Sequence, residues 1–359
     1  MEAALALGRR GLGRVWPNPA VGCVLVLDGR VVGRGWTQPG GRPHAEAEAL
    51  ARAGADARGA TCYVTLEPCS HHGRAPPCAT ALIEAGVARV VAAIEDPDPR
   101  VSGRGFARLE AAGIAVERGP GEAMARFDNA GFLTRIVAER PLIALKMATT
   151  LDGRIASRKG VSRWITSPEA RAAGHRLRAG YDAVMVGART ALLDNPRLDC
   201  RLDGLRDRAP LRIVADSRLG LPPTHHLVAG SQPCWALCRD DADKDRAKVL
   251  EDAGVRLIGL PAGEDGRMDL AAGLRRLGEA GLTRLLVEGG GQLAAALLKA
   301  ELVDRIHWFR APAVMGGDGQ PAVAALGVDT PGGAPRFCLH ARRMAGNDIW
   351  EVWRRCSPA

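Results

Sequence analysis

Residues 65–78 read TLEPCSHHGRAPPC, and residues 44–46, ahead of them, read HAE. His44 opens a predicted helix, whereas Cys69 and Cys78 lie at the two ends of a loop that joins a predicted strand to the next predicted helix. Catalytic zinc sites use three nitrogen or sulfur ligands and keep a fourth position for water. We therefore expect His44, Cys69 and Cys78 to bind Zn²⁺ and to organise the fold of this part of the chain.

Glu46 stands two residues beyond His44. A water activated by zinc needs a nearby carboxylate that carries its proton to the leaving group. The H-x-E…P-C-x-x-C signature of nucleobase deaminases assigns this role to its glutamate, so we assign Glu46 the same role. The chain departs from that signature in one respect, because eight residues separate its two cysteines instead of two.

The segments around these motifs alternate between strand and helix patterns. Two apolar runs flank Asp28-Gly29, a dipeptide typical of two-residue hairpin turns. The predicted strands span residues 21–27, 31–36, 61–66 and 89–94, and the predicted helices span 45–53 and 79–85. This order predicts a sheet covered by helices.

A second domain is predicted to begin after residues 139–141, where a helix over 121–138 ends at Arg140-Pro141 and apolar patterning restarts. The two domains are then 1–140 and 141–359. Ser167-Pro168-Glu169 is a typical helix start. The predicted strands of the second half cover 142–148, 183–186, 211–215, 235–238, 255–258, 284–287 and 305–311.

Residues 288–292 read EGGGQ and lie between a predicted strand and a predicted helix over 293–299. Glycines at such a junction let the backbone approach phosphate oxygens at a helix N-terminus. They are equally typical of a turn that needs positive φ. Residues 146–154 and 162–167 add polar segments near strand ends, although Trp164 could be a core anchor and Asp152-Gly153 only a turn.

Composition limits the possible functions of the chain. Its length of 359 residues favours two domains, and its formal charge of +9 fits either nucleic acid or small anionic substrates. Dispersed arginines and only 4% aromatic residues favour small phosphorylated molecules. Nine cysteines at irregular spacing do not indicate a disulfide framework. We expect no signal peptide, no membrane span and a cytoplasmic location.

The run over residues 65–78 closely resembles the bifunctional riboflavin-biosynthesis deaminase/reductase family, which also has the long spacing between the cysteines. The resemblance extends through residues 17–23, 151–154, 164–167 and 288–290, in the expected order. It implies an α/β protein with an N-terminal cytidine-deaminase-like three-layer α/β/α domain and a C-terminal dihydrofolate-reductase-like domain. It also implies removal of the 2-amino group of diaminohydroxy-phosphoribosylaminopyrimidine, followed by NADPH-dependent reduction of the ribosyl group of the aminouracil product to ribityl.

Matching motif positions implies further site residues. For the deaminase, Asn18, His71 and Arg74 are expected to bind substrate. For the reductase, the expected NADPH residues are Ala148, Trp164, Thr190, Asp194, Ser217, Gly290, Gly291, Gln292, Leu293, Ala294, Ala295 and Ala296. The expected substrate residues are Lys146, Ser162, Arg178, Leu198, Arg201 and Glu288, and the guanidinium groups of the two arginines suit a 5′-phosphate.

Two alternatives stay open on the sequence alone. The chain could be a zinc deaminase that acts on nucleic acid, with a binding module in its second half. Its zinc could also be purely structural, with His71 or His72 as a fourth ligand. The family resemblance implies instead small phosphoribosyl pyrimidines as partners and a homodimer. One departure is Thr37-Gln38, because relatives commonly have histidine before this glutamine.

Overall fold

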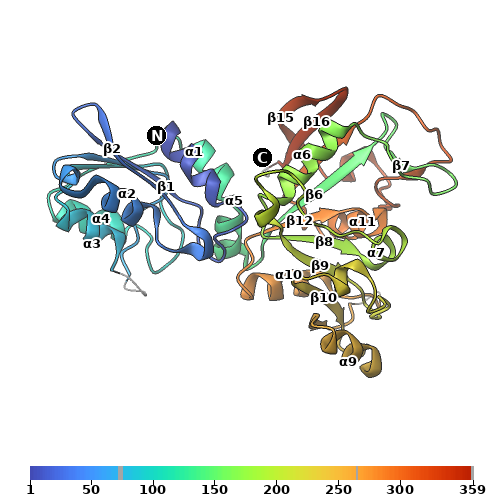
Figure 1. Cartoon of the computed structure of the whole chain (residues 1–359). Helices are drawn as coiled ribbons and strands as arrows, with labels where there is room; N and C mark the ends of the chain where they lie inside the picture. The colour runs from blue at the N-terminus through green and yellow to red at the C-terminus, as the bar shows by residue number, and fades with distance from the viewer. Residues whose placement is uncertain (72–75, 264–265, 357–359) are drawn as a thin grey trace. The chain divides into compact units, whose positions relative to one another are not determined.

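The computed structural model describes residues 1–71, 76–263 and 266–356 (Figure 1). The chain divides into two compact units, Met1–Glu139 and Arg140–Ala359, which we call the first and the second unit. Within the described ranges, no helix combines the length and the apolar character needed to cross a membrane.

The first unit is a five-stranded sheet with helices on both faces. Its strands are β1 (Gly22–Leu27), β2 (Arg30–Trp36), β3 (Thr61–Val64), β4 (Arg89–Ala92) and β5 (Ala115–Arg118), in the order β2-β1-β3-β4-β5. Its helices are α1 (Glu2–Gly8), α2 (Ala45–Ala53), α3 (Cys78–Glu84), α4 (Arg104–Ala111) and α5 (Glu122–Ala138). Strands β1 and β2 form the predicted hairpin, with positive φ at Asp28 and Gly29.

Glycines in this hairpin let helices lie very close to the sheet. A Cβ on Gly35 would lie 2.1 Å from the carbonyl oxygen of Ala45 in α2, and one on Gly22 would lie 1.9 Å from the carbonyl oxygen of Ala4 in α1. Gly35 pairs with Cys23, the neighbour of Gly22, so the two glycines face opposite sides of the sheet. The close approach on one face determines where α2 begins, and therefore where His44 and Glu46 lie.

The second unit contains a nine-stranded mixed sheet in the order β11-β10-β9-β8-β12-β6-β13-β16-β15. Its strands are β6 (Leu142–Thr149), β8 (Ala183–Gly187), β9 (Leu211–Ala215), β10 (Cys234–Arg239), β11 (Arg256–Leu260), β12 (Arg284–Glu288), β13 (Arg305–Arg310), β15 (Phe337–Ala345) and β16 (Asp348–Arg355). A separate pair consists of β7 (Arg154–Ala156) and β14 (Gln320–Pro321). The helices are α6 (Pro168–Arg178), α7 (Ala188–Asp194), α8 (His226–Ala229), α9 (Lys244–Asp252), α10 (Leu270–Glu279) and α11 (Gly291–Lys299).

Seven neighbouring strands of this sheet, from β11 to β13, run parallel. Their carboxyl ends therefore meet at one edge, where ligands bind in open α/β sheets. Strand β12 is buried along its whole length, which fits its unbroken apolar run Leu285-Leu286-Val287. The predicted start of α6 is confirmed: Ser167 is the N-cap, and its hydroxyl accepts from the backbone N–H of Ala170 at 3.2 Å.

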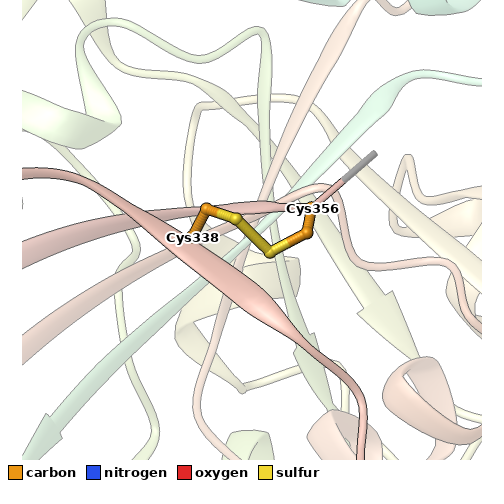
Figure 2. The surroundings of a disulfide bond; sticks show 2 residues. All are labelled: Cys338 and Cys356. Atoms are coloured by element: carbon orange, nitrogen blue, oxygen red, sulfur yellow. A yellow bond between two sulfur atoms is a disulfide. The ribbon is translucent and has the colours of Figure 1, made fainter. Parts of the chain in front are cut away.

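An antiparallel hairpin of β15 and β16 closes the other end of this sheet. The two strands are joined by a disulfide between Cys338 and Cys356 (Figure 2). We expected no disulfide framework from the cysteine spacing, and the other seven cysteines are indeed free. The expectation is wrong for this one pair because antiparallel pairing brings Cys338 opposite Arg354, close to Cys356.

Candidate active sites

Three ligand atoms meet in the first unit. His44 is the N-cap residue of α2 and its side chain does not cap the helix, so its ring is free to face the two cysteines. Its Nδ1 lies 3.4 Å from Cys78 Sγ and 3.7 Å from Cys69 Sγ, and the three ligand atoms lie within 4.8 Å of one another. Tetrahedral zinc ligands, with bonds of about 2.0 to 2.3 Å, lie roughly 3.6 Å apart. The donor set and its spacing therefore fit zinc.

The start of α3 stabilises a thiolate at this point. Cys78 is the first residue of α3, and its backbone N–H donates to Cys69 Sγ at 3.3 Å. Hydrogen bonding from Cys78, together with that from His44, lowers the pKa of Cys69 to about 4. Cysteine binds metals as the thiolate, so Cys69 is already in the form that a metal needs.

Glu46 lies in the first turn of α2 and is only 4% exposed. Burial raises its pKa to about 7. Together with His44 and Cys69 it lines a cavity of about 80 Å³, which also has Asn18 and His71 in its wall. Glu46 therefore faces the same space as two of the metal ligands, and a carboxyl group that titrates near neutrality is suited to accept and return a proton.

The remaining predicted residues of this site are placed as follows. His71 lines both the 80 Å³ cavity and an adjoining one of about 310 Å³, and its buried Nδ1 has no hydrogen-bond partner among the described residues. His71 is not part of the three-ligand group. Arg74 and His72 lie outside the described residues. Thr37 is buried in the cavity wall, where its hydroxyl accepts from the Val21 backbone N–H at 3.0 Å.

A buried glutamate that sequence reasoning missed holds the loop before Cys69. The carboxylate of Glu67 accepts from the backbone N–H groups of Asp96, Gly103, Gly105 and Phe106, at 2.8 to 3.3 Å. These bonds join the end of β3 to the start of α4. In the run Glu67-Pro68-Cys69 we predicted a role only for Cys69. A charged residue at the end of a strand could have indicated that Glu67 anchors this loop.

Sequence reasoning also missed the charged residues in the wall of the 80 Å³ cavity. This wall includes Arg42, Asp96, Asp98 and Arg100. Asp98 holds the Arg100 guanidinium, with Nε at 2.9 and 3.1 Å from its two oxygens. Burial raises the pKa of Asp96 to about 6. The available signal was the position of Asp96-Pro97-Asp98 just beyond a parallel strand, where ligand-binding residues gather.

In the second unit, a cavity of about 1040 Å³ lies at the carboxyl edge of the parallel strands. Six of the predicted NADPH residues line it: Thr190, Ser217, Gly290, Gln292, Leu293 and Ala296. Gly289 and Gly290 both have positive φ, and a Cβ on Gly290 would lie 3.1 Å from Thr190 Oγ1. The backbone just before the first turn of α11 therefore carries no side chain at Gly289 and Gly290, and a phosphate group is favoured at this position. These features fit a dinucleotide.

The other predicted NADPH residues do not line this cavity. Ala294 and Ala295 are buried on the inner face of α11, and Ala148 packs against the small core around Phe309. Trp164 is 68% exposed, so its alternative reading as a core anchor is wrong. Asp194 ends α7, and its carbonyl oxygen accepts from the guanidinium of Arg163, next to Trp164, at 3.2 Å.

The predicted substrate residues centre on a buried charged cluster. Glu288 forms a two-pronged pair with Arg178, with Nε–Oε1 at 2.6 Å and Nη2–Oε2 at 3.0 Å, and Lys146 Nζ lies 3.8 Å from Glu288 Oε2. Burial opposes ionisation of Glu288, but the charges of Arg178 and Lys146 lower its pKa to about 2. Burial also lowers the pKa of Lys146. Arg178 was predicted to bind a phosphate, yet two nitrogens of its guanidinium group already donate to the carboxylate of Glu288.

A loop after α7 completes the cluster. The carbonyl oxygen of Asp199 accepts from Arg178 Nη1 at 2.8 Å and contacts His175 Nδ1 at 3.1 Å. The carboxylate of Asp199 pairs with Arg201 at 3.3 Å. The preceding Leu198 has φ of 54°. Asp199 and His175 were missed, although His175 lies one helical turn before Arg178 in α6. Ser162 is half-buried in the loop before α6.

Comparison with known proteins covers both units. Residues 1–94 match the cytidine and deoxycytidylate deaminase zinc-binding region, and residues 141–349 match the RibD C-terminal domain. The riboflavin biosynthesis protein RibD of Escherichia coli K12 is 42% identical, over 97% of this chain and 96% of its own length.

Solved structures of related proteins have the same fold over almost the whole of this chain. Acinetobacter baumannii RibD (form 1) has a TM-score of 0.89 at 35% identity, covering 99% of this chain and 98% of its own. A diaminohydroxyphosphoribosylaminopyrimidine deaminase/5-amino-6-(5-phosphoribosylamino)uracil reductase of Thermotoga maritima has a TM-score of 0.86 at 33% identity, covering 99% and 97%. The chain therefore belongs to the RibD family of riboflavin biosynthesis proteins.

Proposed function

We propose that this chain carries out two successive steps of riboflavin biosynthesis. The first is hydrolytic deamination of 2,5-diamino-6-ribosylamino-4(3H)-pyrimidinone 5′-phosphate, which we assign to residues 1–140. The second is NADPH-dependent reduction of the ribosyl group of 5-amino-6-(5-phosphoribosylamino)uracil to ribityl, which we assign to residues 141–359. Membership of the RibD family supports both steps.

The observation that carries the deamination is the three-ligand group beside buried Glu46. Zinc, when bound by His44, Cys69 and Cys78, supplies a water whose pKa is lowered toward about 7. Glu46 would accept a proton at the start of the reaction and return it to the departing amino group, which leaves as ammonia while the ring carbon gains a carbonyl oxygen. Asn18 and His71, in the same cavity wall, would hold the pyrimidine.

Our proposal for the reductase uses the cavity and the charged cluster together. NADPH supplies a hydride when it is bound. The residues at the edge of the sheet would hold the dinucleotide, with Gly290 beside its phosphates. Lys146 and Glu288 would hold the substrate near the carbon that receives hydride, and Arg201, which is 61% exposed, is the more available of the two arginines for its phosphate.

The nucleic-acid alternative has no support in the second unit, because that half of the chain matches the RibD C-terminal domain. The structural-zinc alternative requires a fourth ligand, and among the described residues His71 does not join the ligand group.

A coupled assay tests the proposal. Supplied with the diamino substrate, the protein should release one ammonia per molecule and only then oxidise NADPH. Release of ammonia without NADPH oxidation, even with the deaminated substrate supplied, would contradict the reductase step alone.

We also propose that the protein works in the cytoplasm as a homodimer through its second unit, as the family resemblance implies. Multi-angle light scattering should give twice the chain mass of 37.9 kDa, and a monomer at micromolar concentration would contradict this.

A further inference from the structure

The two adjoining cavities of the first unit differ in their charge. The 80 Å³ cavity contains the carboxyl groups of Glu46, Asp96 and Asp98, whereas the described residues of the 310 Å³ cavity include no carboxylate. Glu46 lines only the smaller cavity, so the ring that is deaminated must lie there. The rest of a phosphoribosyl substrate has to extend out of that cavity, and the larger one offers space without negative charge.

Arg42 lies where the two cavities meet. Four of the described residues line both cavities, namely Arg42, His44, Cys69 and His71. His44 and Cys69 belong to the three-ligand group, so the side chains of Arg42 and His71 remain for the substrate. An arginine side chain keeps its positive charge at every physiological pH. Arg42 therefore provides a permanent cation at the passage between the two cavities.

The guanidinium group of Arg42 is not engaged by a carboxylate. Within the described ranges, Arg42 forms neither an ion pair nor a side-chain hydrogen bond. Arg100, in the wall of the 80 Å³ cavity, instead donates to both carboxylate oxygens of Asp98. Arg42 can therefore bind an anionic group without breaking an ion pair that the structure describes.

The backbone that carries Arg42 is held in place by a closed loop. The backbone N–H of Gln38 donates to the carbonyl oxygen of Pro43 at 3.0 Å, which closes the connection between β2 and α2 around Arg42. Gly41 has a φ of 84°, and a Cβ on it would lie 1.8 Å from the side-chain nitrogen of Asn18. Because Gly41 has no side chain, Asn18, which we expect to hold the pyrimidine, packs directly beside the backbone next to Arg42.

We propose that Arg42 binds the 5′-phosphate of the diamino substrate and makes the deaminase select the phosphorylated substrate over the free nucleoside. Planar guanidinium forks match phosphate oxygens. Thr37, in the wall of the 80 Å³ cavity, is uncharged, and its hydroxyl already accepts from the Val21 backbone N–H. Arg42 is not among the substrate residues that the family resemblance implies. The proposal rests on the deamination proposed above.

The test measures ammonia release by the full-length zinc-containing protein without NADPH, so that only the deamination is followed. The two substrates are 2,5-diamino-6-ribosylamino-4(3H)-pyrimidinone 5′-phosphate and the same compound without its phosphate. Arg42→Gln should lower kcat/KM for the phosphorylated substrate about 10- to 100-fold, as expected for lost hydrogen bonds to a charged group. The value for the free nucleoside should stay nearly the same, because that compound has no phosphate to bind. Arg42→Lys keeps the charge without the planar fork and should lie between the wild type and Arg42→Gln.

The matched control is Arg34→Gln, because Arg34 is exposed in β2 and lines neither cavity. It removes one positive charge from the same unit and should leave both kcat/KM values unchanged. Arg42 lies two residues before a zinc ligand, so the zinc content of each variant is measured and should stay near one per chain.

An equal loss for both substrates in Arg42→Gln, or a loss of zinc, would overturn the proposal, since the arginine would then support the metal site or the fold. An unchanged preference for the phosphorylated substrate in Arg42→Gln would overturn it as well. A wild type that deaminates neither substrate would contradict the deaminase function itself.

Discussion

The two sites of this chain are built on different scales. In the first unit the ligand atoms come from residues 44–78 and lie within 4.8 Å of one another. In the second unit the charged cluster and the cavity draw on residues from Lys146 to Ala300 and extend along the edge of a parallel sheet. A metal ion needs every donor within a few tenths of an ångström, whereas a dinucleotide is held by many weaker contacts.

The two sites are therefore sensitive to different kinds of substitution. One proton carrier serves the first site, so its loss removes a whole chemical function. In the second site the binding energy is distributed, and a single change removes a fraction of it.

Glu46→Gln should reduce deamination by about 10²- to 10⁴-fold, because the amide cannot accept the proton. Zinc content should stay near one per chain, since Glu46 is not one of the three ligands. Ammonia release and metal analysis check both points. Glu48→Gln, on the same helix but outside the cavity, is the control and should keep full activity. Wild-type deamination by Glu46→Gln would remove the assigned role.

Glu288→Gln should destabilise the second unit by about 3 kcal/mol, because it leaves the buried Arg178 and Lys146 cations without their carboxylate. Urea unfolding measures this loss. Glu279→Gln is the matched control: its pair with Arg276 is 65% exposed on both sides, so the change should cost no more than about 0.5 kcal/mol. Equal stability of the two variants would mean that the buried cluster contributes no more than a surface pair.

Gly290→Ala should weaken NADPH binding about tenfold. Its φ of 87° strains an L side chain, and the new Cβ would lie 3.1 Å from the hydroxyl oxygen of Thr190 in the cavity wall. Gly204→Ala has a similar φ of 75° with nothing within 4 Å, so it incurs only the backbone strain. Calorimetric titration should show weaker NADPH binding for the first variant alone. Deamination should be unaffected in both.

A more gradual effect, spread over a range of pH, concerns the buried His307 of β13. Burial, reinforced by the nearby charges of Arg305 and Arg284, lowers its pKa well below the usual value. The unfolded chain therefore binds a proton below about pH 6.5 while the folded protein does not, and stability falls as the pH falls, by up to about 1.4 kcal/mol per pH unit. His307→Gln should flatten the dependence of urea unfolding on pH between 6.5 and 5. An unchanged slope would show that His307 is not its source.

Much of the secondary structure follows from local pattern. The hairpin around Asp28-Gly29, helix α2, strand β9 and the start of α6 lie where the sequence predicts them. The terminal hairpin was not predicted, because β15 is exposed along most of its length and lacks an apolar alternation. Helix α4 was also missed, since its N-cap is Gly103, which offers no capping side chain.

Local sequence patterns were enough to predict the chemistry of the first site, because His44, Glu46, Cys69 and Cys78 each stand at a recognisable junction of loop and helix. They also indicated the bare backbone at Gly290. The folded arrangement was needed to show which charges neutralise one another: Glu288 pairs with Arg178, and Asp241 pairs with Arg239. Spacing and periodicity are local properties of a sequence, whereas an ion pair depends on which strand ends the sheet brings together.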